Sequence, residues 1–243
     1  MQASGPRSPV SACMLFTDRL RQKAAPIWEK ELSHPFVKGI GDGTLPVEKF
    51  RFYLHQDYLF LIEYCRVFAL AVVKAQDLPT MGKFAQLLHA TLTTEMDLHR
   101  GYARKFGIAP EELEATKMAP TTHAYTRHLL HVAGIGTLGD LVAAVLPCQL
   151  GYWEIGTHLA KVQGAGGEEL QTPGSRLYQE WIQMYSSQEF GGLAQGLSDL
   201  MNALATGEKE EALARMEEEF LISSRYEYMF WEMCDREETW IVG

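Results

Sequence analysis

Apolar residues recur every three or four positions along nearly the whole chain, which is the period of an α-helix. No segment alternates apolar and polar residues over the length that a β-strand needs. We therefore predict an all-α fold, a single-domain helical bundle. Its helices are expected at residues 16–34, 46–76, 80–106, 121–134, 138–161, 176–187, 190–205 and 208–238.

Glycine and proline mark the connections between these helices. The sequence GIGDGTLP at 39–46 indicates an irregular connection, and QGAGGEELQTPGS at 163–175 is the clearest loop. The first 14 residues are rich in Ser, Pro and Gly and contain no apolar run. We expect a flexible tail at 1–14, neither a signal peptide nor a membrane anchor, followed by one helical domain at 15–243.

Composition narrows the possible partners. The chain has 243 residues, of which 47% are hydrophobic, so it can bury a large core. Its formal net charge of −9 argues against nucleic acid and anionic membranes as partners. The four cysteines form no Cys-x-x-Cys pair, which excludes the usual zinc and dithiol motifs. A core of this size needs no disulfides, so we expect reduced thiols and a cytoplasmic location.

Three polar residues occupy positions where the helical period requires an apolar side chain. Asp57 shares its face with aromatic and aliphatic residues three, four and seven positions away. Glu227 and Cys148 lie on similar apolar faces of two other helices. A buried carboxylate with a raised pKa suits general acid catalysis, and a thiol in the same cavity would supply a nucleophile. Each residue also has a structural explanation, namely core packing for the cysteine and a satisfied hydrogen bond for either carboxylate.

A metal centre is the main alternative, since helical bundles often hold two irons between carboxylates and histidines. That site needs Glu-x-x-His on two helices, and only Glu31 and His34 have this spacing, at a helix end beside a proline. Glu95 with His99 and Glu154 with His158 are four residues apart, and we interpret both as surface pairs. No histidine lies on an obviously apolar face, although the sequence leaves a haem ligand among the eight open. We predict no metal and no cofactor.

Four sequence segments together resemble the TenA, or thiaminase II, family. They are HPFVKGIGDGTLP, FRFYLHQDYLFL, VLPCQLGYWEIG and FLISSRYEYMFW, in the order and spacing of that family. The resemblance runs from about residue 16 to 240. It implies a haem-oxygenase-like helical fold without haem, usually assembled as a homotetramer. It also implies an aminopyrimidine hydrolase of thiamin salvage, which converts 4-amino-5-aminomethyl-2-methylpyrimidine to the 5-hydroxymethyl compound and ammonia. Many members also cleave thiamin.

The resemblance also implies a role for individual residues. The family's nucleophile falls on Cys148, its pyrimidine-binding aspartate on Asp57 and its acid on Glu227. The aromatic residues expected around the ring are Tyr125, Tyr152, Tyr185 and Phe230. Where several members have a tyrosine three residues after the aspartate, this chain has Phe60, so a hydroxyl near the thiol or the leaving group is missing.

Two other functions remain open from the sequence. A non-catalytic pyrimidine-binding or regulatory protein would keep the aspartate and the aromatic residues but would not need Cys148 or Glu227, and both are present. A redox enzyme on the same fold would carry a bound metal or haem. The sequence does not rank thiamin against the aminomethyl pyrimidine as substrate.

Overall fold

The computed structural model describes residues 14–166 and 175–242, and this part of the chain is helical without a strand. The predicted all-α class is confirmed. No helix in the described ranges is long and apolar enough to cross a membrane. The elements are α1 Phe16–Leu32, α2 Pro35–Asp42, α3 Val47–Lys74, α4 Leu78–Ala90, the π-helical turn η1 Thr91–Glu95, α5 Met96–Lys105, α6 Pro110–Ala115, α7 Pro120–Ile135, α8 Leu138–Gly166, α9 Ser175–Tyr185, α10 Gln188–Ala205 and α11 Glu210–Arg236.

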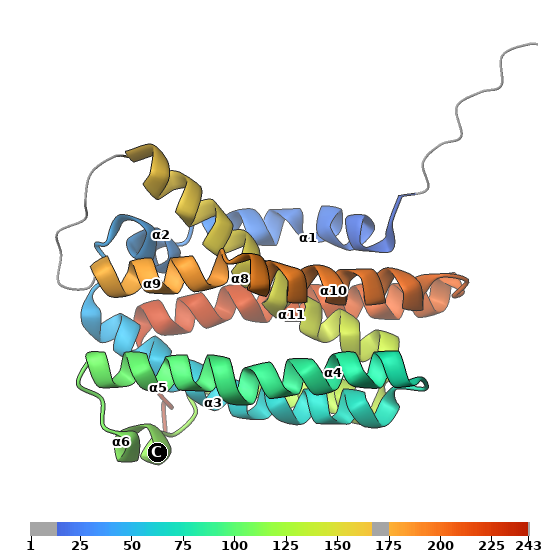
Figure 1. The fold of residues 1–243 in the computed structure, drawn as a ribbon, viewed down its shortest axis with the longest axis horizontal. Helices are drawn as coiled ribbons and strands as arrows, with labels where there is room; N and C mark the ends of the chain where they lie inside the picture. The colour runs from blue at the N-terminus through green and yellow to red at the C-terminus, as the bar shows by residue number, and fades with distance from the viewer. Residues whose placement is uncertain (1–13, 167–174, 243) are drawn as a thin grey trace, which may run out of the picture.

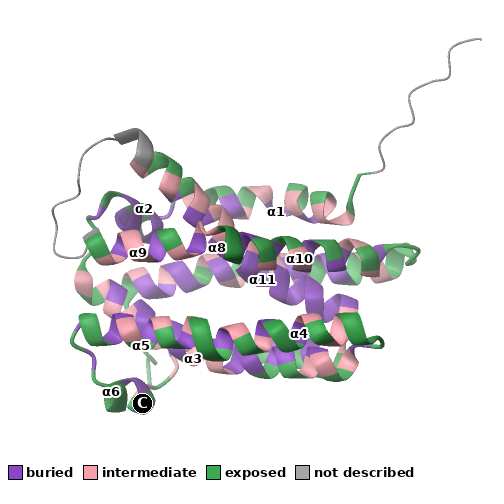
Figure 2. Cartoon of the chain, viewed as in Figure 1, coloured by how far each residue is buried: buried purple, intermediate pink, exposed green. Residues whose placement is uncertain are grey.

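Three long helices, α3, α8 and α11, form the centre of the bundle (Figure 1). Helix α8 packs against α11, α10 and α9, while α3 packs against α4 and α7. Buried residues concentrate on the sides of these helices that face one another (Figure 2). Asp57, Cys148 and Glu227 each come from a different one of the three, so the functional candidates lie where the core elements meet.

The segment at 39–46 is predicted to be an irregular connection. Its first part is helical instead, because helix α2 runs to Asp42. Pro35 occupies the first turn, and the His34 ring accepts a hydrogen bond from the Phe36 amide. The glycines are needed for close packing. A Cβ atom on Gly41 would lie 2.7 Å from the Leu159 side chain, and one on Gly39 would lie 3.0 Å from Cβ of Leu45.

The single helix predicted at 80–106 is divided by a π-helical turn. Helices α4 and α5 run nearly end to end along one side of the molecule (Figure 1), with η1 between them. In this turn the amide of Met96 bonds to the carbonyl of Thr91, five residues earlier. Such turns insert an extra residue and change the direction of the following side chains. Glu95 ends this turn and His99 lies one turn beyond it.

Both ends of the segment predicted as a loop at 163–175 are helical. Helix α8 continues to Gly166 and α9 begins at Ser175. Residues 167–174 lie outside the described part of the chain, as does nearly all of the predicted tail at 1–14.

Candidate active site

Asp57 is held in the core by two hydrogen bonds. Its side chain is 3% exposed, and its Oδ2 accepts a hydrogen bond from the Tyr53 hydroxyl at 3.2 Å. The same oxygen pairs with Nε2 of His99 from α5. Trp181 in turn donates to the Tyr53 hydroxyl at 3.1 Å. Both bonds to the carboxylate fall on Oδ2, so they leave Oδ1 for another donor.

His99 contradicts the prediction of a surface pair with Glu95. Its side chain is 2% exposed, and its Nδ1 donates to the backbone carbonyl of Glu95 at 3.0 Å. Burial by itself would lower the pKa of His99, but Asp57 and Glu95 outweigh it and raise this pKa above the ordinary value. The pairing with Asp57 therefore favours the protonated form of His99. Apolar neighbours at Met96, Tyr102 and Ala103, three or four positions away, were the sequence signal for this burial.

Glu227 and Cys148 meet next to this network. The Tyr125 hydroxyl donates to Oε1 of Glu227 at 2.5 Å. Burial raises the pKa of Glu227 to about 8, although Tyr125 and Cys148 both favour the ionised form. Burial and then the carboxylates of Glu227, Glu95 and Asp57 raise the pKa of the Cys148 thiol well above its usual value. Both groups are therefore protonated at neutral pH in the free protein.

A narrow cavity lies between these residues. Asp57, Phe60, Cys148, Tyr152 and Tyr185 are among the residues that line it. The Tyr152 and Tyr185 ring centroids are 4.8 Å apart at its wall. Aromatic side chains of this kind suit stacking against a small aromatic ring.

The remaining predicted site residues, Tyr125, Phe230 and Glu227, lie next to residues that line the cavity. The Phe60 ring lies 5.1 Å from that of Tyr125 and 5.8 Å from that of Phe230. The Tyr125 hydroxyl is bonded to Glu227, and Glu227 lies beside Cys148, so both residues are connected to the cavity through the cysteine. The structure thus brings all eight candidate residues into one cluster, while their roles in binding or catalysis stay predictions.

Glu95 and Gln149 are among the cavity residues that were not predicted as site residues from the sequence. Glu95 is half-buried and accepts a hydrogen bond from the Tyr185 hydroxyl at 3.4 Å. Burial raises the pKa of Glu95 to about 7, against the opposing effect of His99. Gln149, one residue after the cysteine, also lines the cavity. Its position was visible in the sequence, but nothing there distinguished it from a core-facing glutamine.

The alternative metal ligands do not assemble. His34 caps α2, and its Nε2 lies 3.0 Å from Glu232 rather than beside Glu31. In the described ranges no three His, Cys, Asp or Glu side chains are grouped to hold an ion. Glu154 pairs with Arg21 at 2.7 Å on the outside of the bundle.

The fold and this site place the chain in a class of all-helical proteins in which a buried thiol and carboxylates lie around a small cavity with aromatic walls. The TENA/THI-4/PQQC family model matches residues 21–237, and the chain belongs to this family.

Individual relatives agree with that assignment. An aminopyrimidine aminohydrolase of Halalkalibacterium halodurans is 49% identical over 93% of this chain and 98% of its own length. A TenA homologue from P. horikoshii OT3 superposes with a TM-score of 0.82 at 28% identity, covering 92% of this chain and 99% of that one. A domain from Shewanella denitrificans with a heme oxygenase-like fold has a TM-score of 0.72 at 14% identity, covering 93% and 94%, and so supports the predicted fold alone.

Proposed function

We propose that this protein is an aminopyrimidine aminohydrolase. The substrate would be 4-amino-5-aminomethyl-2-methylpyrimidine, the products the 5-hydroxymethyl pyrimidine and ammonia, and thiamin a second substrate. The observation that carries the proposal is the convergence of three side chains from three helices: Asp57 and Cys148 line one aromatic-walled cavity, and Glu227 lies beside Cys148. The similarity to a relative described as an aminopyrimidine aminohydrolase supports the same reaction.

The first step would add the Cys148 thiol across the bond between ring carbon 6 and ring nitrogen 1. Glu227 is protonated below about pH 8, so it can donate its proton to nitrogen 1 while it receives the thiol proton. Glu227 ends this step protonated, as it began, and no free thiolate has to form in the apolar cavity. This relay accounts for a nucleophile whose pKa is raised rather than lowered.

The second step would release ammonia. The adduct is no longer aromatic, so the lone pair of the 4-amino group can expel the amine from the exocyclic methylene. Positive charge then develops on the 4-amino nitrogen, and the Asp57 carboxylate is the group assigned to bind it. Water adds to the methylene, and its surplus proton leaves with ammonia as ammonium. As the carbon–sulfur bond breaks, Glu227 gives its proton to the departing sulfur and takes up the proton of nitrogen 1, which restores the thiol, the carboxylic acid and the aromatic ring.

The direct test is incubation of the purified protein with the aminomethyl pyrimidine and, separately, with thiamin. Chromatography should detect the hydroxymethyl pyrimidine in the first reaction and both halves of thiamin in the second. Binding of the hydroxymethyl pyrimidine without turnover of either substrate would favour the non-catalytic binding protein instead. Haem or flavin absorbance, or bound metal, in the purified protein would point to the redox alternative.

The assembly and location remain proposals as well. We propose a homotetramer in the cytoplasm, built from one helical domain at 15–243. The buried, unpaired cysteines in the described ranges, Cys65, Cys148 and Cys234, are consistent with a reducing compartment. Light scattering coupled to size-exclusion chromatography would measure the oligomer, and a dimer or monomer mass would contradict it.

A further inference from the structure

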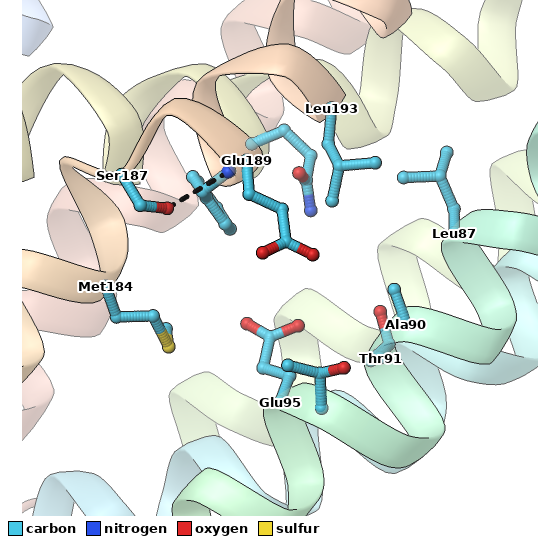
Figure 3. Close-up of a pocket in the computed structure, with 11 residues that line it drawn as sticks. Leu87, Ala90, Thr91, Glu95, Met184, Ser187, Glu189 and Leu193 are labelled. Atoms are coloured by element: carbon cyan, nitrogen blue, oxygen red, sulfur yellow. Dashed lines mark hydrogen bonds between the residues drawn. The ribbon is translucent and has the colours of Figure 1, made fainter.

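A second, outer pocket adjoins the inner cavity. The two share Glu95, Gln149 and Phe190 as common walls. Leu87 and Leu193 are among its apolar residues, and Figure 3 shows them to the right of the two carboxylates. Because the two spaces have walls in common, a substituent on a ring held in the inner cavity can extend toward the outer pocket.

The charged groups of the outer pocket are acidic. The carboxylates of Glu95, from η1, and Glu189, from α10, point toward one another across it (Figure 3). Its lining residues include no Lys, Arg or His. A cation would therefore be favoured there, and an anion would be repelled.

Gln149 supplies an independent indication of a ligand. Its side chain is 4% exposed, and its Oε1 is buried without a hydrogen-bond partner. A buried amide oxygen without a donor is costly, and native proteins rarely retain one unless a ligand or water completes it. The missing partner must carry N–H or O–H hydrogens. Together with the two carboxylates, this favours a protonated amine over a cation without such hydrogens.

We propose that Glu95 and Gln149 form the subsite for the leaving group, and that they bind the ammonium of the substrate's 5-aminomethyl arm. Glu189, which is exposed, lies at the outer side and attracts cations to the entrance. This inference rests on the proposed function and names the residues that select its substrate. Glu95 is a binding residue here, distinct from the acid that protonates the ring.

The subsite also has a chemical consequence. An amine held as ammonium leaves as neutral ammonia: the carbon–nitrogen bond breaks, its electron pair stays on nitrogen, and no further proton is required. Glu95 favours the ammonium form of the bound substrate by charge. Ammonia is then released on the side of the outer pocket, away from the thiol.

A structural explanation for Glu95 makes a different prediction. Glu95 bonds to Tyr185, and Tyr185 lines the cavity for the ring. If Glu95 only positioned Tyr185, its loss would weaken all pyrimidine ligands equally. A subsite for the ammonium would instead affect only ligands that carry this group.

Calorimetric binding in the Cys148→Ser background tests the two explanations. The probes are the aminomethyl pyrimidine and the hydroxymethyl pyrimidine, which differ only in the arm. Glu95→Gln should weaken the aminomethyl compound by about tenfold or more, as expected for loss of a charge-assisted bond, and change the hydroxymethyl compound by less than about twofold. Gln149→Met should act in the same direction. Asp97→Asn, which removes an exposed carboxylate two residues from Glu95, should change neither.

The outcomes separate the two proposals. Equal weakening of both ligands by Glu95→Gln, or no weakening of either, overturns the subsite while leaving the hydrolase intact. Failure of both pyrimidines to bind the unmodified protein overturns the proposed function itself. If residual turnover of Cys148→Ser obscures the aminomethyl measurement, initial rates of the unmodified chain and of Glu95→Gln replace it. The subsite then requires a higher KM for the aminomethyl compound with an unchanged inhibition constant for the hydroxymethyl compound.

Discussion

The Tyr125 hydroxyl donates a 2.5 Å hydrogen bond to Oε1 of Glu227, joining α7 to α11 across 102 residues of sequence. The bond favours the ionised carboxylate, yet burial prevails and raises the pKa of Glu227 to about 8. Asp57, Tyr125 and Cys148 are the titratable groups that act on it. Glu227 is thus a proton donor at neutral pH, and the Tyr125 hydrogen bond makes it a stronger acid than burial alone would allow.

The pH dependence of turnover should follow from this pKa. Activity requires protonated Glu227, and the protonated fraction falls as the pH rises through about 8. We expect kcat/KM of the unmodified protein to decline above that pH. Glu227→Gln should lower kcat about 10²- to 10⁴-fold, the usual range for a lost general acid. Rate measurements from pH 6 to 10 check both expectations.

Tyr125→Phe is the matched variant for that profile. It removes the donor that favours the carboxylate, so the pKa of Glu227 should rise and the alkaline decline should move to higher pH. If the decline stays at the same pH or moves to lower pH, the titration of a group other than Glu227 causes it.

Cys148→Ser should abolish nearly all turnover, because a serine hydroxyl is a far weaker nucleophile toward the ring. The hydroxymethyl pyrimidine should still bind, since the thiol is not assigned to hold the ring. Steady-state rates and calorimetry measure the two properties. Cys65→Ser is the control, as this thiol is buried elsewhere on α3. Full activity in Cys148→Ser would disprove the covalent mechanism.

His99→Asn should weaken binding of the hydroxymethyl pyrimidine about tenfold, or ~1.4 kcal/mol. The variant removes the imidazole that is hydrogen-bonded to Asp57, so the carboxylate loses the partner that fixes its position. His89→Asn, at an exposed position of α4, should bind normally. Unchanged binding in His99→Asn, with normal folding by circular dichroism, would show that Asp57 needs no such support.

Phe60→Tyr should increase kcat several-fold with little change in KM. The Phe60 ring lines the cavity beside Cys148, so a hydroxyl there could donate to the leaving group or the attacking water. Initial rates with both substrates test this. Phe60→Leu is the control, because it adds no hydroxyl. A Phe60→Tyr variant with lower kcat would mean that the ring serves packing against Tyr64 and Tyr125 alone.

Gly156→Ala should destabilise the fold by about 1–3 kcal/mol, the usual cost of overpacking. A Cβ at this position in α8 would lie 2.6 Å from the carbonyl carbon of Tyr185, and backbone cannot move aside as a side chain can. Gly192→Ala in α10 meets nothing within 4 Å and should stabilise by roughly 0.5–1 kcal/mol. Urea unfolding measures both. Equal stability of the two variants would contradict the close approach of α8 to Tyr185.

Helical periodicity was sufficient for the fold class and for most helices, because the buried face of each helix repeats its apolar residues. It failed at 35–42, where Gly39 and Gly41 suggested a loop. Gly39 lies against Leu45, and Gly41 lies against Leu159, which is distant along the chain. Close packing therefore explains the two glycines. It also missed the π-helical turn, since an extra residue in a helix changes the register without changing the composition.

The sequence by itself determined that Asp57, Cys148 and Glu227 occupy apolar helix faces, and the family segments implied a role for each. Only the tertiary structure decided that the three side chains form one cluster, since the angle between packed helices is not encoded in the period of any one of them. It also decided the partners: His99 for Asp57 and Tyr125 for Glu227. Burial depends on what the rest of the chain places over a residue, and for this reason Glu95 and His99 resembled surface residues in the sequence and proved to be part of the site.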